Sequence, residues 1–136
     1  MTIQTSTQSL AGLSSPMEII ALAKKGLPKR SADVLAKGVG LTDREMARIL
    51  NISERTFHRY RADTMLDTAA TERLLQLVLL YKKGEDVFED IDKFKRWVRR
   101  PLRLFGDKSP LDILDTTTGF RLVEDELGRI EYGVYI

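Results

Sequence analysis

A single stretch constrains the fold more than any other: residues 41–61 read LTDREMARILNISERTFHRYR. Thr42 and Glu45 have the spacing of a capping box, the reciprocal side-chain-to-backbone pairing that begins many helices. Apolar residues then recur at helical spacing, namely Met46, Ala47, Ile49 and Leu50. Asn51 tolerates the left-handed conformation of a tight turn, and Ser53 can cap a second helix. The stretch therefore predicts two helices joined by a short turn, a helix-turn-helix unit.

The second of these helices has an inward stripe of Phe57 and Tyr60 and a polar outer face. Short hydroxyl donors at a helix N-terminus suit phosphates, and arginines suit guanine edges. A helical hairpin with a solvated charged face has similar charges, but two capped helices with the small Ala47 at their crossing favour a DNA-binding unit. The predicted DNA contacts are Arg44, Ser53, Arg55, Thr56, His58, Arg59 and Arg61.

The net charge of +2 conceals an asymmetry along the chain. Residues 24–61 contain ten Lys or Arg against four Asp or Glu, a local charge of +6. Residues 105–136 contain three against seven, a local charge of −4. The basic part includes the helix-turn-helix, as a phosphate-binding surface should. The acidic part indicates a different partner, although solvation alone also accounts for a modest acidic surface.

Composition disfavours catalysis. The chain has no cysteine and one histidine, so thiolate sites and most histidine-based metal sites or triads are excluded. Two clusters remain as catalytic candidates: His58 with a carboxylate, and Glu124-Asp125-Glu126. His58 lies among arginines of the second helix, and three consecutive helical residues point to different sides and cannot converge on one substrate. We expect no enzyme, no metal and no cofactor.

No apolar run approaches the roughly 18 residues of a membrane span. The N-terminus lacks a basic segment followed by an apolar core, so no signal peptide is expected. These features predict a cytoplasmic protein of bacterial type with no membrane partner.

The rest of the chain predicts an all-α fold. Residues 1–14 are polar and are expected to form a flexible arm. Ser15-Pro16-Met17-Glu18 has the pattern of a helix start, and that helix should end at Gly26. A short helix ending at Gly38 or Gly40 precedes the helix-turn-helix. Residues 15–66 then form the DNA-binding half.

Residues 67–136 predict a second, helical half. A helix from about Thr68 that stops at Gly84 has almost no polar face, so we expect it to be central or to form a dimer interface. A helix over residues 90–100, ended by Pro101, should bury Trp97. Its other face is strongly basic, which fits a second phosphate contact or a solvated surface.

The last elements begin at Ser109-Pro110 and at Thr116 or Thr118, and Gly128 is the expected stop of the final helix. Its inward residues are Phe120, Val123 and Leu127. Residues 129–136 read RIEYGVYI and alternate in polarity, which predicts a short extended C-terminal tail. Because no second strand is expected, this tail should lie on the helical core or be held for another protein.

Several motifs in the two halves together resemble those of one known protein family. In the N-terminal half they are Gly26-Leu27-Pro28, Ile52-Ser53-x-x-Thr56-Phe57-x-Arg59 and Thr71-Glu72-Arg73-Leu74. In the C-terminal half they include Val87-Phe88, Trp97, Pro101, Ser109-Pro110-Leu111-x-x-Leu114-Asp115-Thr116 and the run from Leu127 to Tyr135. The first group resembles Xre-type antitoxins, and the second, more specific group resembles the toxin-binding domain of the Xre/MbcA/ParS family.

The resemblance implies the antitoxin of a RES–Xre toxin–antitoxin pair. Such an antitoxin dimerises, covers the active site of a toxin that consumes NAD or transfers ADP-ribose, and represses its own operon by binding operator DNA. The toxin contacts expected on the C-terminal tail are Arg129, Glu131, Tyr132, Val134 and Tyr135. Two departures are Asn51, where the family turn often has glycine, and the basic stretch Leu102-Arg103-Leu104.

A second hypothesis is a transcription regulator whose C-terminal half only dimerises or senses a ligand. A reading frame for a RES-domain protein beside this gene would favour the antitoxin.

Overall fold

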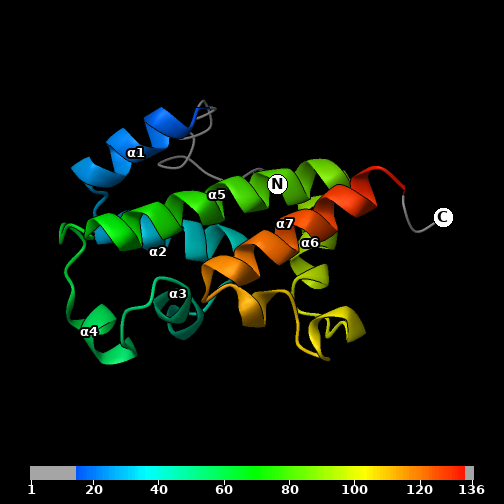
Figure 1. The fold of residues 1–136 in the computed structure, drawn as a ribbon. Coiled ribbons are helices and arrows are strands. Elements are labelled where there is room, and N and C mark those ends of the chain that lie inside the picture. The colour runs from blue at the N-terminus through cyan, green and yellow to red at the C-terminus, as the bar shows by residue number, and fades with distance from the viewer. Residues whose placement is uncertain (1–14, 134–136) are drawn as a thin grey trace. The chain divides into compact units, whose positions relative to one another are not determined.

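The computed structural model describes residues 15–133 (Figure 1). Within that range the chain forms seven α-helices and two short 3-10 helices, with no strand, which confirms the predicted all-α class. The chain divides into two compact units between Leu79 and Leu80. This division falls within α5 (Thr68–Phe88), a helix of 21 residues.

The N-terminal unit contains α1 (Pro16–Lys25), α2 (Lys29–Val39), α3 (Asp43–Ile49), α4 (Glu54–Arg59) and the first part of α5. Its helix starts are as predicted: Ser15 Oγ accepts the Glu18 N–H at 3.1 Å, and Thr42 and Glu45 form the reciprocal capping box. Gly26 and Gly40 end α1 and α2 with positive φ angles of 89° and 75°. Local caps and glycines therefore mark several of the helix boundaries in this half.

Two loops of the N-terminal unit are bound together by backbone pairing. Leu66 N–H donates to Leu27 O at 2.8 Å, and Lys29 N–H donates to Thr64 O at 2.8 Å. The buried Thr71 hydroxyl joins the same region, since it accepts the Leu27 N–H at 3.2 Å and donates to Leu66 O at 3.2 Å. The segment that follows α4 is therefore fixed to the turn between α1 and α2.

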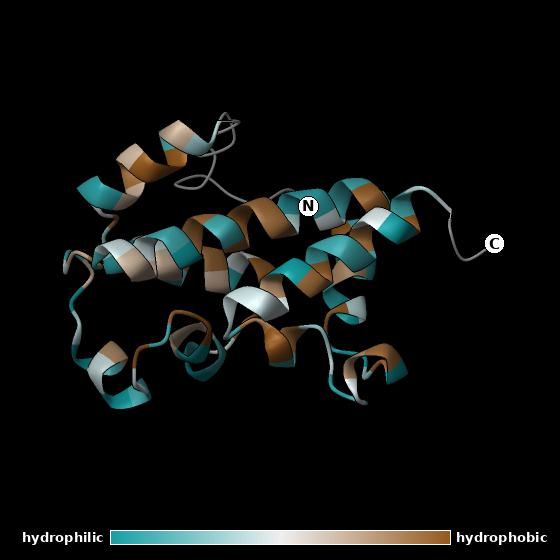
Figure 2. Ribbon diagram, viewed as in Figure 1, coloured by the Kyte–Doolittle hydropathy of each residue, from teal (hydrophilic) through white to brown (hydrophobic). Residues whose placement is uncertain are grey.

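The C-terminal unit contains the end of α5, α6 (Ile91–Trp97), η2 (Arg103–Phe105), η3 (Leu111–Ile113) and α7 (Thr117–Glu131). Four aromatic rings form part of its core, with centroids 5.1–5.9 Å apart: Tyr81, Phe88, Phe94 and Trp97. Trp97 is buried, as predicted. Figure 2 shows apolar residues along the middle of α5, and Leu74, Leu75, Leu77, Val78, Leu80 and Tyr81 there are all buried.

Two predicted helix ends in the second half are wrong. Gly84 does not stop α5, which continues to Phe88. The glycine instead leaves space for the Phe94 ring. The helix expected over residues 90–100 ends at Trp97, before Pro101, and its chain continues in tight turns. The short helix predicted after Ser109 is present as the 3-10 helix η3, which ends at Ile113.

The predicted end of the last helix is also wrong. Thr116 caps α7 as expected, but the helix passes through Gly128 and ends at Glu131. Arg129 and Glu131 are therefore helical, and Tyr132 and Gly133 follow in a turn, so the tail predicted from residue 129 is not extended over residues 129–133. Alternating polarity over so few residues is also compatible with a final helical turn. Val134 and Tyr135 lie outside the described residues.

Candidate functional site

The turn between α3 and α4 has the conformation that the sequence predicts. Asn51 adopts a φ of 61°, in the left-handed region, and Ser53 caps α4. Ser53 Oγ accepts the Thr56 N–H at 3.1 Å and donates to Thr56 Oγ1 at 2.8 Å. The start of α4 therefore presents two hydroxyl groups, and hydroxyl groups are among the donors that contact DNA phosphates.

A buried aromatic ring holds α4 in place. Phe57 is fully buried, and Lys29 Nζ lies 4.7 Å from the centroid of its ring. Arg73 of α5 donates to Ile49 O at 3.2 Å, and so satisfies a carbonyl at the end of α3. Tyr60, predicted to share the inward stripe, is only half-buried because the backbone is already extended there.

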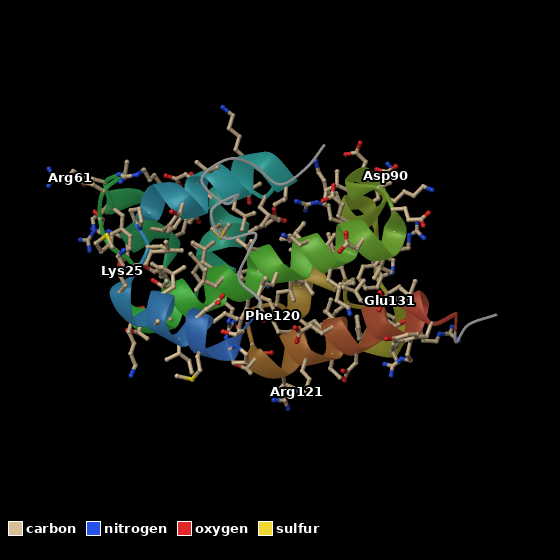
Figure 3. All side chains as sticks on the ribbon, turned by 90° about the horizontal axis from the view of Figure 1, so that it is seen from above. Lys25, Arg61, Asp90, Phe120, Arg121 and Glu131 are labelled. Carbon is tan, nitrogen blue, oxygen red and sulfur yellow. The ribbon has the colours of Figure 1, made fainter. Side chains whose placement is uncertain are left out.

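Most of the predicted DNA contacts are exposed on or beside α3 and α4, whereas Thr56 is half-buried and Arg61 lies beyond the helix. Arg44 lies on α3, and Arg55, His58 and Arg59 lie on α4, all exposed. Arg61 is not on the helix, because α4 ends at Arg59. Its side chain extends away from the ribbon (Figure 3), with Nε 4.0 Å from the carboxylate of Asp63.

Two polar side-chain contacts join α3 and α4, and neither could be predicted directly from the sequence. His58 Nε2 lies 3.4 Å from Asp43 Oδ2, and Arg44 Nε lies 3.9 Å from Glu54 Oε1. Exposed pairs of this kind contribute little to stability, about 0–1 kcal/mol. Within residues 15–133, Arg55 and Arg59 have no ion pair, so their guanidinium groups are available to phosphates or bases.

A second candidate surface lies at the end of α7. Arg129 Nε donates to Glu126 Oε1 at 3.2 Å, and Glu126 is buried. Glu131 lies 3.5 Å from Lys83 Nζ of α5. Tyr132, the residue that caps α7, is 81% exposed, more than any other large hydrophobic side chain of the described residues. An exposed tyrosine beside a positioned arginine is typical of protein interfaces.

The outer face of α7 extends this surface toward the helix start. Leu122, Asp125, Arg129 and Tyr132 are spaced at i, i+3, i+7 and i+10, and so share one face. Leu122 is exposed and was missed from sequence, although its position outside the inward stripe of Phe120, Val123 and Leu127 was a usable signal. Figure 3 shows Arg121, beside Leu122, pointing outward from α7.

The carboxylates of α7 are not equivalent. Burial raises the pKa of Glu124 above its ordinary value, and the neighbouring Asp125 raises it further. Lys83 and Arg121 oppose this shift only in part. Among the described residues no three His, Cys, Asp or Glu side chains gather to hold a metal ion.

In comparisons with known proteins, the two residue ranges that contain these surfaces match two protein-family domains. Residues 18–79 match the antitoxin Xre-like helix-turn-helix domain. Residues 83–133 match the antitoxin Xre/MbcA/ParS C-terminal toxin-binding domain. An antitoxin Xre from Photorhabdus laumondii is 30% identical over 123 residues, which cover 89% of this chain and 83% of the relative. The chain belongs to the Xre antitoxin family.

Two further relatives support the membership. A Prs ADP-ribosylating antitoxin from Sphingobium sp. is 29% identical over 131 residues, or 89% of this chain and 82% of that protein. An antitoxin Xre from Yersinia enterocolitica is 32% identical over 93 residues, or 67% of this chain and 63% of that protein. The predicted resemblance is thus confirmed, and the protein is the antitoxin of a toxin–antitoxin system, with a DNA-binding domain and a toxin-binding domain.

No helix within residues 15–133 of this Xre antitoxin is long and apolar enough to cross a membrane.

Proposed function

We propose that this Xre antitoxin neutralises a RES-domain toxin by covering its active site, and represses its own operon through α3 and α4. The observation that carries the first part is the end of α7, where exposed Tyr132 and the Glu126–Arg129 pair lie within the matched toxin-binding domain. Arg129 and Tyr132 belong to the run from Leu127 to Tyr135, by which the chain resembles RES–Xre antitoxins.

Charge supports this partner. A toxin that binds NAD must present donors to a pyrophosphate, so its cleft should be electropositive. The exposed acidic residues of α7, Glu124, Asp125 and Glu131, are complementary to such a cleft. In this arrangement Tyr132 is the aromatic anchor, Arg129 and Glu131 are polar contacts, and Val134 and Tyr135 continue the contact along the chain.

The toxin's chemistry is NAD consumption or transfer of ADP-ribose. The Sphingobium relative's name refers to ADP-ribosylation of Prs, which favours the second reaction for a toxin of this group. The antitoxin itself acts by binding and needs no cofactor.

The DNA-binding part of the proposal uses the predicted residues of α3, α4 and the segment after them. The hydroxyls of Ser53 and Thr56 contact phosphate, and Arg55 and Arg59 read bases, with Arg44, His58 and Arg61 at the edges of the surface. One helix-turn-helix makes few base contacts, so a homodimer on two half-sites is the expected binding form. The toxin complex is then a larger assembly built on this dimer.

The test is co-expression with the RES-domain protein encoded beside this gene. Cells that express the toxin alone should lose NAD or gain ADP-ribosylated protein, and cells that also express the antitoxin should do neither. The two proteins should co-purify, with a light-scattering mass that requires two antitoxin chains. A toxin that stays active, or that fails to co-purify with the full-length antitoxin, would overturn the neutralisation proposal, and a complex with a single antitoxin chain would overturn the dimer.

A further inference from the structure

A dense run of positive charge lies in the C-terminal unit, far from the helix-turn-helix in sequence. Residues 93–108 contain seven Lys or Arg against one Asp, a local charge of +6. The helix-turn-helix region needs residues 24–61 to reach the same charge. Residues 80–92 carry −3, with two Lys against five Asp or Glu, and residues 109–136 carry −4, with two Arg against six. Positive charge is thus segregated within this unit rather than mixed across it.

The cations of this basic segment, residues 93–108, face solvent. Those that are exposed are Lys93, Arg96, Arg99, Arg100, Arg103 and Lys108. Lys95 is half-buried and lies 3.8 Å from Asp92. Among residues 15–133, Lys93, Arg96, Arg100, Arg103 and Lys108 have no carboxylate partner. Guanidinium and ammonium groups without a carboxylate partner are not neutralised within the protein. They therefore contribute to a positive surface potential that attracts an external anion.

The backbone that presents these cations is held by the core of the unit. Phe94 and Trp97 of α6 are buried in the aromatic cluster. The following loop is closed by Leu102 N–H donating to Lys108 O at 3.0 Å, and by Asp107 N–H donating to Leu102 O at 3.0 Å. The segment, yellow-green to yellow in Figure 1, therefore offers its charges from fixed positions rather than from a polar tail.

We propose that the basic segment binds the phosphate backbone of duplex DNA, as a second DNA contact in addition to the helix-turn-helix. An electropositive cleft on the toxin would repel this positively charged segment, and it is complementary to the acidic residues of α7 instead. The same chain contains a DNA-binding domain, so duplex DNA is a polyanion that this protein already meets. Exposed arginines and lysines without exposed aromatic side chains among them favour contact with the phosphates of a duplex over stacking with unpaired bases.

Such contacts add affinity without sequence preference, so the salt dependence of binding measures them directly. Each lost phosphate contact lowers the magnitude of the slope of log K against log salt by about 1. The test compares Arg96→Gln/Arg100→Gln with Lys83→Gln/Arg121→Gln in the full-length protein. Both variants remove two positive charges from the same unit, but only the first changes the basic segment. Binding is measured by fluorescence anisotropy on a random-sequence duplex and on the fragment upstream of this gene, with circular dichroism as the check on folding.

The first variant should reduce the magnitude of the slope of log K against log salt by about 2 on both duplexes. The ratio of the affinities for the two duplexes should stay unchanged. The control should keep the wild-type slope. Equal slopes for the two variants would overturn the proposal. If the first variant kept the DNA slope but lost co-purification with the toxin, an acidic toxin surface would be the occupant and the proposal would be wrong. A failure of the proposed operator binding by the helix-turn-helix would give a distinct result, because the wild-type protein would then bind the upstream fragment and the random duplex with equal affinity.

Discussion

The ring of Phe94 in α6 occupies the space in which Gly84 of α5 would carry a side chain. A Cβ built on Gly84 overlaps three atoms of that ring. Phe94 is fully buried and packs against Tyr81, with ring centroids 5.1 Å apart, and against Trp97 at 5.8 Å. The ring therefore has little freedom to move aside, and the close approach of the two helices depends on this glycine.

Gly84→Ala should lower the free energy of unfolding by about 1–3 kcal/mol, the usual cost of inserting a methyl group into a packed core. Alanine favours a helix over glycine by about 1 kcal/mol, so this loss is the net of two opposed effects. Gly128→Ala is the matched control, because nothing lies within 4 Å of a Cβ there and α7 is helical. It should raise stability by up to about 1 kcal/mol. Urea unfolding of both variants measures the difference, and two shifts of the same sign would contradict the packing argument.

The same glycine shows where sequence reasoning reaches its limit. Helix starts follow from neighbouring side chains, so the caps at Ser15, Thr42, Ser53 and Thr116 could be predicted. A glycine in a helical pattern can end the helix in a left-handed conformation, as Gly40 does. It can also lie within the helix and leave space for a neighbouring side chain, as Gly84 does. Only the position of Phe94 separates them, and that position is a tertiary property.

The candidate surfaces were predictable in part for similar reasons. Exposed arginines on α4 follow from the position of the buried Phe57, which defines the opposite face. The contact between His58 and Asp43 depends on how α3 and α4 cross, and that crossing cannot be predicted from the sequence. The pairing of Arg129 with Glu126 requires both residues to lie on one helix. The alternating polarity of residues 129–136 indicates a strand instead, so this pair could not be predicted.

Ser53 should contribute to both stability and DNA binding, and two substitutions separate these roles. Ser53→Ala removes the cap of α4 and should cost about 1 kcal/mol of stability. Ser53→Asp keeps a cap and a favourable charge at the helix N-terminus, so its stability should stay close to wild type. Its carboxylate would repel phosphate, however, and DNA affinity at low salt should fall more than in Ser53→Ala. Thermal unfolding and gel shifts on the upstream fragment measure the two effects; wild-type affinity for Ser53→Asp would place this helix start away from DNA.

Arg55→Ala and Arg59→Ala should each weaken binding to the upstream fragment by about 1–3 kcal/mol if they contact bases. Neither arginine has an ion pair among the described residues, so the loss reports on DNA rather than on a broken bridge. Lys37→Ala, an exposed cation of α2, is the control for lost charge. The arginine variants should lose their preference over a random duplex, whereas the control should keep it. Unchanged affinity in both arginine variants would show that α4 does not face DNA.

Glu124 should make the antitoxin less stable as the pH rises. Its pKa is raised by burial and by Asp125, so the folded protein binds this proton more tightly than the unfolded chain does. As pH rises from the unfolded to the folded pKa, stability therefore falls, and above the folded pKa the loss is complete. Glu124→Gln should be more stable than wild type at neutral pH, and this advantage should vanish below the unfolded pKa, about 4. Asp86→Asn, exposed on α5, controls for a lost negative charge in urea unfolding at several pH values; an advantage of Glu124→Gln that persists at the lowest pH would contradict the assignment.

Tyr132 should be the main anchor for the toxin. Its side chain is 81% exposed at the end of α7, where the free protein gains nothing from an aromatic ring in water. Tyr132→Ala should therefore leave helicity and stability unchanged and weaken toxin binding by about 2 kcal/mol, roughly thirtyfold. A truncation after Leu127 would be a poorer test, because it also removes the last turn of α7 with the Glu126–Arg129 and Lys83–Glu131 pairs.

Two further variants make the result specific. Tyr132→Phe keeps the ring and loses the hydroxyl group, so binding close to wild type would assign the contact to apolar burial. Met17→Ala truncates another exposed apolar side chain, on α1 of the DNA-binding unit, and should leave toxin affinity unchanged. Affinities come from calorimetry with the purified toxin, and protection is scored by growth of cells that express both proteins. If Tyr132→Ala binds and protects as well as Met17→Ala, the toxin is held elsewhere on the domain, and the exposed face that includes Leu122 is the next surface to test.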